Sequence, residues 1–318
     1  MAKHHDAALS RSLDMITILY CPQMTDLAGR ICEVNKSCRP GEITWRNFRD
    51  GFPDLRILKA AELRNRHLVF LASFDHQAEI FRQLSVIYEL PRLAVKSLKV
   101  VLPYFSTGTM ERVNEEGEIA TAATLARMLS NIPGTMSGPV QIIIYDIHAL
   151  QERFYFSDQV IPRLETAVPL LLDRIRGLKN VAVAFPDEGA WKRFGRMFSE
   201  YPLITAHKVR EGKTRKVIIK EGIPAGKHVV IVDDLVMTGG TLLQCRQALV
   251  ESGAQMVSAY VTHGVFPQDS WQGFLDQGFS SFWLTDSCPD TAARVQGRGP
   301  FEVLSLAGDI SRKIIPDV

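Results

Sequence analysis

The chain has 318 residues, of which 46% are hydrophobic and 23% are charged, with a formal net charge of +2 at pH 7. This length suits two ordinary domains or one large one, and so small a charge gives no reason to expect nucleic acid as a partner. Five cysteines without a CxxC pair argue for reduced thiols and against a zinc site. No apolar run approaches the ~18 residues of a membrane span. The polar stretch Met1–Asp14 lacks the apolar core of a secretory signal, so we expect a cytoplasmic protein without a membrane partner.

Short apolar, β-branched runs alternate with helical patterns along the chain. The predicted strands are Ile16–Tyr20, His67–Leu71, Val100–Pro103, Gln141–Tyr145, Val181–Phe185, His228–Val232 and Ser258–Val261. The predicted helices include Ile80–Tyr88, Ala120–Ser130, Val160–Leu172 and Leu242–Ser252. This alternation is typical of an α/β fold with mainly parallel sheets. A loop near residues 150–157 predicts domains 1–155 and 156–318.

The two halves of the chain resemble each other without gaps. His67-Leu-Val-Phe-Leu aligns with His228-Val-Val-Ile-Val, and at the same offset Phe105 falls on Phe266. The alignment places Ala78-Glu-Ile opposite Gly239-Gly-Thr. If the similarity is not a chance one, the first half keeps the fold of the second and lacks its glycine-containing turn.

The most informative segment is residues 229–241, Val-Val-Ile-Val-Asp-Asp-Leu-Val-Met-Thr-Gly-Gly-Thr. A buried strand delivers Asp233 and Asp234 to the carboxyl edge of a sheet, where open α/β folds bind ligands. Thr238-Gly239-Gly240-Thr241 then turns into a helix. Glycines let backbone N–H groups converge on an anion, and the helix N-terminus adds its dipole. A phosphate fits this turn and the carboxylates suit a ribose diol; the alternative is an ordinary turn with solvated acids.

Two further polar residues follow predicted strands. Asp187 comes after Val181–Phe185, where it could hold Mg²⁺ or a ribose hydroxyl, or simply cap the next helix. His148 lies in the loop after Gln141–Tyr145 and could coordinate a nucleotide-bound metal or contact a phosphate. A structural or solvated histidine is the alternative.

A basic segment predicts a hairpin with Glu211-Gly212 at its turn. Lys208 and Arg210 lie in it, and such cations stabilise the charge that develops in phosphoryl transfer. A solvated basic hairpin is an equally good interpretation of this segment alone.

Two weaker candidates lie in the first half of the chain. Phe48 lies in a turn, from which it could stack on a base, and Arg112 follows a polar loop that could contact a nucleotide. Trp191 and Trp271 are interpreted as core or interface residues.

In this order and spacing the motifs resemble the ribose-phosphate diphosphokinase (phosphoribosyl pyrophosphate synthetase) family over nearly the whole chain, in particular its plant-type class II members. The blocks that carry the resemblance are Leu71-Ala-Ser-Phe, Gln83-Leu-Ser-Val-Ile-Tyr, Asp146-Ile-His-Ala-Leu-Gln-Glu-Arg-Phe-Tyr-Phe, Val261-Thr-His-Gly-Val-Phe-Pro, Thr285-Asp-Ser-Cys-Pro and Phe301-Glu-Val-Leu-Ser-Leu-Ala-Gly.

The resemblance implies two tandem phosphoribosyltransferase-like (type I) domains, with ATP on the first and ribose 5-phosphate on the second. It implies Mg²⁺ as cofactor, attack of the 1-hydroxyl of ribose 5-phosphate on the β-phosphorus of ATP, and release of AMP. A homo-oligomer is expected, in which Phe48 reaches ATP across a subunit interface.

The same resemblance assigns roles to the candidate residues. Asp233 and Asp234 hold the ribose hydroxyls, and Thr238, Gly239, Gly240 and Thr241 hold the 5-phosphate. The remaining roles are ATP for Phe48, Arg112 and His148, magnesium for His148 and Asp187, and the transferring phosphates for Lys208 and Arg210. The last helix, within Ser305–Ile314, is expected on the N-terminal domain.

Three positions depart from the class I pattern of this family. Met237 stands where class I has a third acid, the segment after Phe48 lacks Asn-Gln-Glu, and the loop Ser106–Glu111 lacks Arg-Gln. These departures imply a different hydrogen-bond pattern near the sugar phosphate and weaker nucleotide selectivity. Class II membership implies little dependence on inorganic phosphate.

Two other functions fit parts of the pattern. A phosphoribosyltransferase that consumes phosphoribosyl pyrophosphate would explain residues 229–241 but not the second unit or the His148 block. A non-catalytic regulator would explain the fold, but Lys208, Arg210 and His148 are all retained and no helix-turn-helix is visible. The sequence therefore favours the enzyme.

Overall fold

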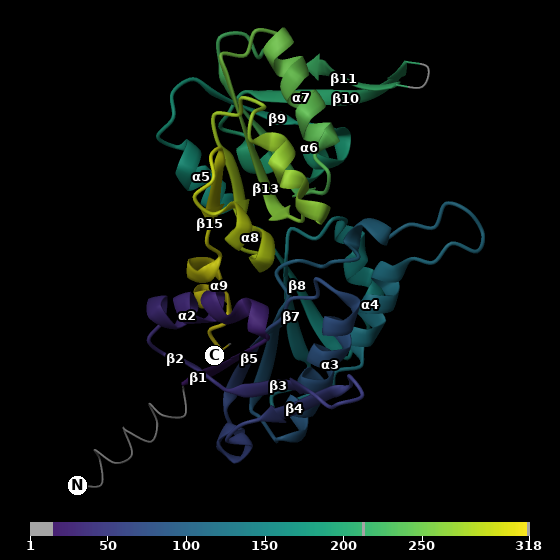
Figure 1. Cartoon of the computed structure of the whole chain (residues 1–318), viewed down its shortest axis with the longest axis vertical. Helices are drawn as coiled ribbons and strands as arrows, with labels where there is room; N and C mark the ends of the chain where they lie inside the picture. Colours follow the sequence, from purple (N-terminus) through teal and green to yellow (C-terminus); the bar gives the residue numbers. More distant parts are fainter. Residues whose placement is uncertain (1–14, 212–213, 317–318) are drawn as a thin grey trace. The chain divides into compact units, whose positions relative to one another are not determined.

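The structure is a computed structural model that describes residues 15–211 and 214–316, including all their side chains except those of 208–211 and 214–216. It divides into two compact units. Unit 1 contains the described residues up to Glu165 and from Leu306 onward, and unit 2 contains Thr166–Ser305. In Figure 1 unit 1 is coloured from purple to teal, with its C-terminal segment in yellow, and unit 2 runs from teal to yellow.

Unit 1 is built on a six-stranded sheet in which every neighbouring pair is parallel. In sheet order its strands are β2 (Cys38–Pro40), β1 (Ile16–Tyr20), β5 (His67–Leu71), β6 (Ser97–Val101), β7 (Val140–Tyr145) and β8 (Val160–Glu165). The helices are α2 (Thr25–Val34), α3 (Gln77–Arg92), α4 (Thr121–Ser130) and α9 (Ala307–Lys313). A separate antiparallel hairpin joins β3 (Ile43–Asn47) to β4 (Pro53–Ile57). The central strands are mostly apolar and buried because both sheet faces are covered.

The C-terminal segment belongs to unit 1. Helix α9 packs beside α2 (Figure 1), and the Tyr145 hydroxyl donates to Asp309 at 2.7 Å. The buried Lys99 ammonium donates to the Ile315 carbonyl at 2.7 Å. The last helix therefore lies on the N-terminal sheet, as the family resemblance implied.

Unit 2 contains a seven-stranded sheet. In sheet order its strands are β11 (Thr214–Glu221), β10 (Leu203–Glu211), β9 (Val181–Phe185), β12 (His228–Val236), β13 (Met256–Gly264), β14 (Phe282–Thr285) and β15 (Phe301–Leu304). Only the β10–β11 pair is antiparallel. The helices are α5 (Val168–Ile175), α6 (Glu188–Phe194), α7 (Gly240–Glu251) and α8 (Pro289–Val295). Short 3₁₀ helices occur in both units, and the one that matters below is η6 (Pro267–Phe274).

The two sheets share one topology. The order β2-β1-β5-β6-β7-β8 of unit 1 matches β10-β9-β12-β13-β14-β15 of unit 2, with corresponding strands in the same chain order. A histidine near the start of one strand bonds a serine of the next in each unit, His67 to Ser97 at 2.6 Å and His228 to Ser258 at 2.8 Å. The predicted α/β fold of two tandem, mainly parallel units is confirmed.

One predicted element is wrong. Residues Val160–Leu172 do not form a helix, because Val160–Glu165 is strand β8 and α5 starts only at Val168. Pro162 lacks the N–H that a helix interior requires, whereas an edge strand such as β8 tolerates it. Since β8 completes the first sheet, unit 1 extends past the expected boundary at residues 155 and 156.

Membrane-spanning helices and cysteine pairing can be checked in the described residues. Within residues 15–211 and 214–316, every helix is too short or too polar to cross a bilayer. Cys21, Cys32, Cys38, Cys245 and Cys288 are free thiols in this structure.

Candidate active site

Strand β12 and helix α7 build the candidate sugar-phosphate site. The strand continues beyond the predicted Val232 to Val236, so Asp233 and Asp234 lie within the strand, near its C-terminal end. Residues 237–239 connect it to α7, which starts at Gly240. A cavity of about 360 Å³ opens here, lined by Asp233, residues 235–242 and Gln244. The structure thus brings Asp233, Thr238, Gly239, Gly240 and Thr241 to one cavity, as predicted, with Asp234 adjoining it.

The two glycines of the turn have different roles. Gly239 has φ +84°, and a Cβ built on it would lie 2.1 Å from Cζ of Phe274, so no side chain fits. A Cβ on Gly240 would meet nothing within 4 Å. Gly240 opens a 12-residue helix, whose first N–H groups have no partner within the helix. An anion in the cavity would satisfy these donors and face the positive end of the dipole.

The carboxylates beside this turn are crowded. Asp234 is buried, and its backbone N–H donates to Asp233 Oδ1 at 3.0 Å. Burial raises the pKa of Asp233 well above its usual range, and the charges of Asp234 and Asp187 raise it further. Such a site favours hydroxyl donors or a cation over additional negative charge.

Asp187 is the third acid at this sheet edge. It follows β9, which pairs in parallel with β12, so both strands deliver their acids to the same edge. Its carboxylate accepts a hydrogen bond from the Ala190 N–H at 3.0 Å and caps α6. The helix cap that the sequence allowed is therefore present, and its predicted magnesium role stays a prediction.

Oxygen ligands of this kind suit Mg²⁺, which typically uses one or two carboxylates together with substrate phosphates and water. Among the residues that the structure describes, no group of three His, Cys, Asp or Glu side chains is arranged as a complete metal site. A cation at this edge of the unit 2 sheet would reduce the repulsion that raises the pKa of Asp233, but it would need further ligands from substrate phosphates and water.

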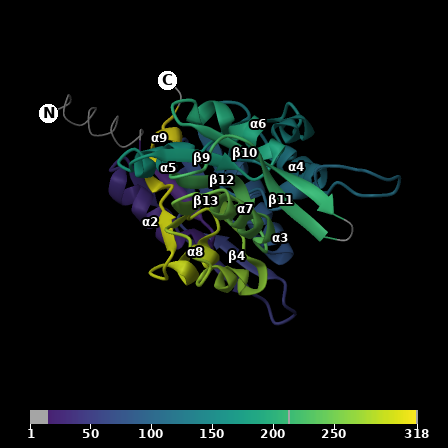
Figure 2. The same ribbon diagram turned by 90° about the horizontal axis from the view of Figure 1, so that it is seen from above.

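The predicted catalytic cations lie on the β10–β11 hairpin, which extends away from the rest of unit 2 in Figures 1 and 2. The backbone of Lys208 pairs with Val217 and that of Arg210 with Arg215. Their side chains lie outside the described part of the structure, so their roles stay predictions.

Arg112 and His148 share a cavity in unit 1. Its volume is about 490 Å³, and its lining includes Met110, Glu111, Asn114 and Glu118. His148 is exposed, and the largely exposed Arg112 pairs with Glu111 at 2.8 Å. The structure therefore brings together two of the three residues predicted to bind ATP. His148 and Asp187, both predicted to serve magnesium, lie in different units.

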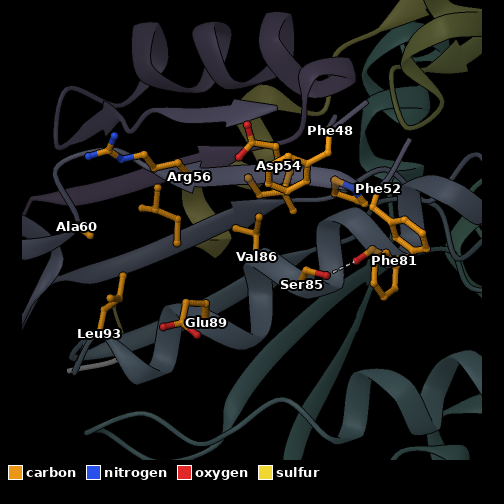
Figure 3. A pocket seen from close by; sticks show the side chains of 13 residues that line it. Phe48, Phe52, Asp54, Arg56, Ala60, Phe81, Ser85, Val86, Glu89 and Leu93 are labelled. Carbon is orange, nitrogen blue, oxygen red and sulfur yellow. Dashed lines mark hydrogen bonds between the residues drawn. The ribbon is translucent and has the colours of Figure 1, made fainter. Parts of the chain in front are cut away.

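Phe48 lies elsewhere in unit 1. It is 58% exposed, at the turn of the β3–β4 hairpin. It lines a groove of about 670 Å³ between this hairpin and α3. Figure 3 shows Phe48, Phe52 and Phe81 at one end of this groove, where the Ser85 hydroxyl bonds the Phe81 carbonyl. Within one chain, Phe48 does not line the cavity of Arg112 and His148.

The sequence did not predict that η6 contacts the turn 238–241 on the side away from the cavity. Ser270 and Phe274, both in η6, contact Met237 and Gly239. Residues 266–274 show neither a strand nor a helix periodicity, and the contact joins positions more than 30 residues apart. The only sequence signal was Trp271, interpreted as a core or interface residue and found buried.

Known families match both units. Residues 16–132 match the N-terminal domain of ribose phosphate pyrophosphokinase, and residues 164–269 match the phosphoribosyl transferase domain.

Curated relatives match over most of the chain. Ribose-phosphate pyrophosphokinase 4 of Arabidopsis thaliana is 53% identical, over 93% of this chain and 90% of the relative. Ribose-phosphate pyrophosphokinase 3, mitochondrial, of Spinacia oleracea is 51% identical, over 93% of this chain and 75% of the relative. A crystal structure of phosphoribosylpyrophosphate synthetase from Mycobacterium smegmatis superposes with a TM-score of 0.79 at 22% identity, covering 94% of this chain and 97% of that one. At that identity the superposition supports the fold alone.

Proposed function

Because this chain belongs to the ribose-phosphate pyrophosphokinase family, a family of transferases of nucleotide biosynthesis, we propose that it uses Mg²⁺–ATP and ribose 5-phosphate. It transfers the β,γ-diphosphoryl group of ATP to the 1-hydroxyl of the sugar. The products are phosphoribosyl pyrophosphate and AMP.

The observation that carries this proposal is the cavity at the end of β12. The turn 238–241 supplies backbone N–H groups and threonine hydroxyls for the 5-phosphate. Asp233 and Asp234 accept hydrogen bonds from the ribose hydroxyls, which relieves the crowding of their negative charge. The sugar is thereby held with its position 1 directed away from the phosphate loop.

The nucleotide site of the proposal is the cavity of Arg112 and His148. Arg112 exchanges Glu111 for a phosphate oxygen, an exchange favoured by its exposure. Phe48, exposed at its hairpin turn, stacks on the base from a neighbouring subunit of a homo-oligomer.

The chain positions its substrates and forms no covalent intermediate. The sugar 1-oxygen gives up its proton to solvent and bonds to the β-phosphorus as the bond from that phosphorus to the α–β bridging oxygen breaks, and AMP leaves with that oxygen. Asp187 of unit 2 and His148 of unit 1 would each serve a magnesium site, and Mg²⁺ when bound would neutralise phosphate oxygens. Lys208 and Arg210, on the hairpin, stabilise the charge that builds up in the transition state.

The placement of the sugar phosphate is tested by calorimetry with ribose 5-phosphate and with ribose. Thr241→Val removes one hydroxyl from the turn, and Thr44→Val, in the hairpin of unit 1, is its matched control. We expect the wild type and Thr44→Val to bind ribose 5-phosphate and not ribose, and Thr241→Val to bind it about five- to tenfold more weakly. Equal binding by both variants would contradict the assignment.

The cellular location of this chain stays a prediction. The relatives' names include a mitochondrial and a chloroplastic protein.

A further inference from the structure

The backbone of the sugar-phosphate turn rests on η6, which contributes nothing to the lining of the cavity. The Ser270 hydroxyl donates to the Met237 carbonyl at 3.0 Å. Just before η6, the N–H groups of Val265 and Phe266 donate to the Val236 carbonyl at 3.1 and 3.4 Å. The two residues that precede the turn are thus bonded to the chain around η6.

Phe274 fixes Gly239, inside the turn, by contact. Its ring occupies the place where a Cβ of Gly239 would project. The ring is fully buried and packs edge-on against Phe266 and Phe282, with centroids 5.4 and 5.2 Å away. A ring held on several sides cannot retreat, so the turn has a rigid support at Gly239.

The backbone at the start of η6 is itself strained. Phe266, Gln268 and Asp269 have φ values of +44°, +55° and +57°, a region that costs free energy for residues other than glycine and persists only where the surroundings enforce it. Asp269 is held by the Arg294 guanidinium at 2.7 Å and by the Trp271 indole N–H at 3.0 Å. Strain of this kind collects where a backbone must be presented in one conformation.

We propose that Ser270 and Phe274 are positioning residues for ribose 5-phosphate. They hold the turn 238–241 in the conformation in which its N–H groups converge on the 5-phosphate, so that the sugar binds a preformed site. This inference rests on the proposed function, because it assumes that the turn binds the sugar phosphate. Neither residue touches the substrate. Their loss weakens the binding of ribose 5-phosphate equally in the ground state and in the transition state.

The test compares Ser270→Ala with Ser270→Thr, which keeps the hydroxyl, and with Ser281→Ala. Ser281 bonds the carbonyl of its neighbour Ser280 and serves as a matched serine of unit 2 away from the turn. Steady-state kinetics and calorimetry with ribose 5-phosphate are measured for each. For Ser270→Ala we expect KM and Kd for ribose 5-phosphate to rise about three- to tenfold, with kcat and KM for ATP within twofold of wild type. Ser270→Thr should recover most of the affinity, and Phe274→Leu should behave like Ser270→Ala.

Each other outcome overturns the inference. Unchanged affinity in Ser270→Ala would show that the bond to Met237 does not position the turn. A parallel fall in kcat and in affinity for both substrates, without recovery in Ser270→Thr, would show a merely structural role. Thr241→Val separates the two levels: if it weakens ribose 5-phosphate binding and Ser270→Ala does not, only this inference fails. If neither variant weakens binding, the proposed sugar-phosphate site fails as well.

Discussion

Gly239 illustrates how one residue serves both the fold and the site. Its positive φ turns the chain from β12 into α7, and its missing side chain leaves room for the Phe274 ring. Gly240, next to it, meets neither demand, because it is helical and a Cβ there is unobstructed. The structure therefore requires glycine at position 239 and does not require it at position 240.

This difference predicts opposite responses to alanine. Gly239→Ala should destabilise the chain by about 1–3 kcal/mol, through backbone strain and the clash with Phe274, and should also raise KM for ribose 5-phosphate. Gly240→Ala should leave thermal stability unchanged or slightly higher. Differential scanning calorimetry of both variants checks this, and equal melting temperatures would remove the support that we assign to Phe274.

Asp233 predicts a trade-off between stability and binding. Its pKa is raised in the folded chain, so the native state holds a proton more tightly than the unfolded state. Stability is then lost as the pH rises from the usual pKa of aspartate toward the raised one. Asp233→Asn removes this loss. It should raise the melting temperature at pH 7 in EDTA, by roughly 2–4 °C if about 1 kcal/mol is recovered.

The same variant should bind ribose 5-phosphate more weakly, because an amide accepts hydroxyl hydrogen bonds less strongly than a carboxylate. Melting curves between pH 4 and 8 and calorimetry with the sugar phosphate measure the two effects. A variant that is neither more stable nor weaker in binding would show that Asp233 is not under the strain described.

At the scale of elements, the sequence predicted what is local. The strands β1, β5 and β9 have the predicted bounds because they are short continuous apolar runs between turn signals. Helix α7 and the acids of β12 follow from the same local pattern. Strands β8, β14 and β15 were missed because they are runs of only four to six residues, whose pairing depends on their sheet neighbours. The support of the turn by Ser270 and Phe274 was missed for the same reason, since it depends on tertiary contact.

Strand β12 also carries a buried titrating group at its start. Burial lowers the pKa of His228, which bonds Ser258 at 2.8 Å. The unfolded chain therefore binds this proton more readily, and stability is lost as the pH falls from the usual histidine pKa, about 6.5, through the lowered one. His228→Gln should flatten the fall of melting temperature between pH 7 and 5. Identical slopes for wild type and variant would contradict this.

The hairpin β10–β11 predicts an effect on turnover. Lys208→Ala should cut kcat by orders of magnitude while the Kd for ribose 5-phosphate stays near that of wild type, because the charge that Lys208 stabilises develops only in the transition state. Lys220→Ala, on the exposed part of β11, is the matched control and should retain activity. Similar kcat values for the two variants would exclude Lys208 from the mechanism.

At the scale of the whole molecule, one topology occurs twice, and the glycine-containing turn 238–241 belongs to the second copy. In unit 1 the fully buried Gln83 side chain bonds the backbone of the segment that follows β5. Its amide accepts from the Ser73 N–H at 3.0 Å and donates to the Ser73 carbonyl at 2.6 Å. These bonds occupy backbone groups in the counterpart of the segment after β12. They support the interpretation that unit 1 keeps the fold without a sugar-phosphate site.

The proposal that ATP binds unit 1 and the sugar phosphate binds unit 2 is consistent with this difference between the two copies of the fold. The sequence made the duplication visible through two matching strand segments. It could not show the six-strand correspondence of the sheets, because most of those strands share no sequence similarity. The pairing of His228 with Met256, where His67 faces Ser97, shows that even the strand registers have diverged.

The central claim is diphosphoryl transfer from ATP to ribose 5-phosphate, and a coupled assay for AMP release tests it most directly. The protein is incubated with Mg²⁺–ATP, with and without ribose 5-phosphate, and with and without inorganic phosphate. We predict that AMP, not ADP, forms only when the sugar phosphate is present, and at a rate nearly independent of inorganic phosphate. ADP as the product, or no AMP from a folded protein that binds ribose 5-phosphate, would contradict the account.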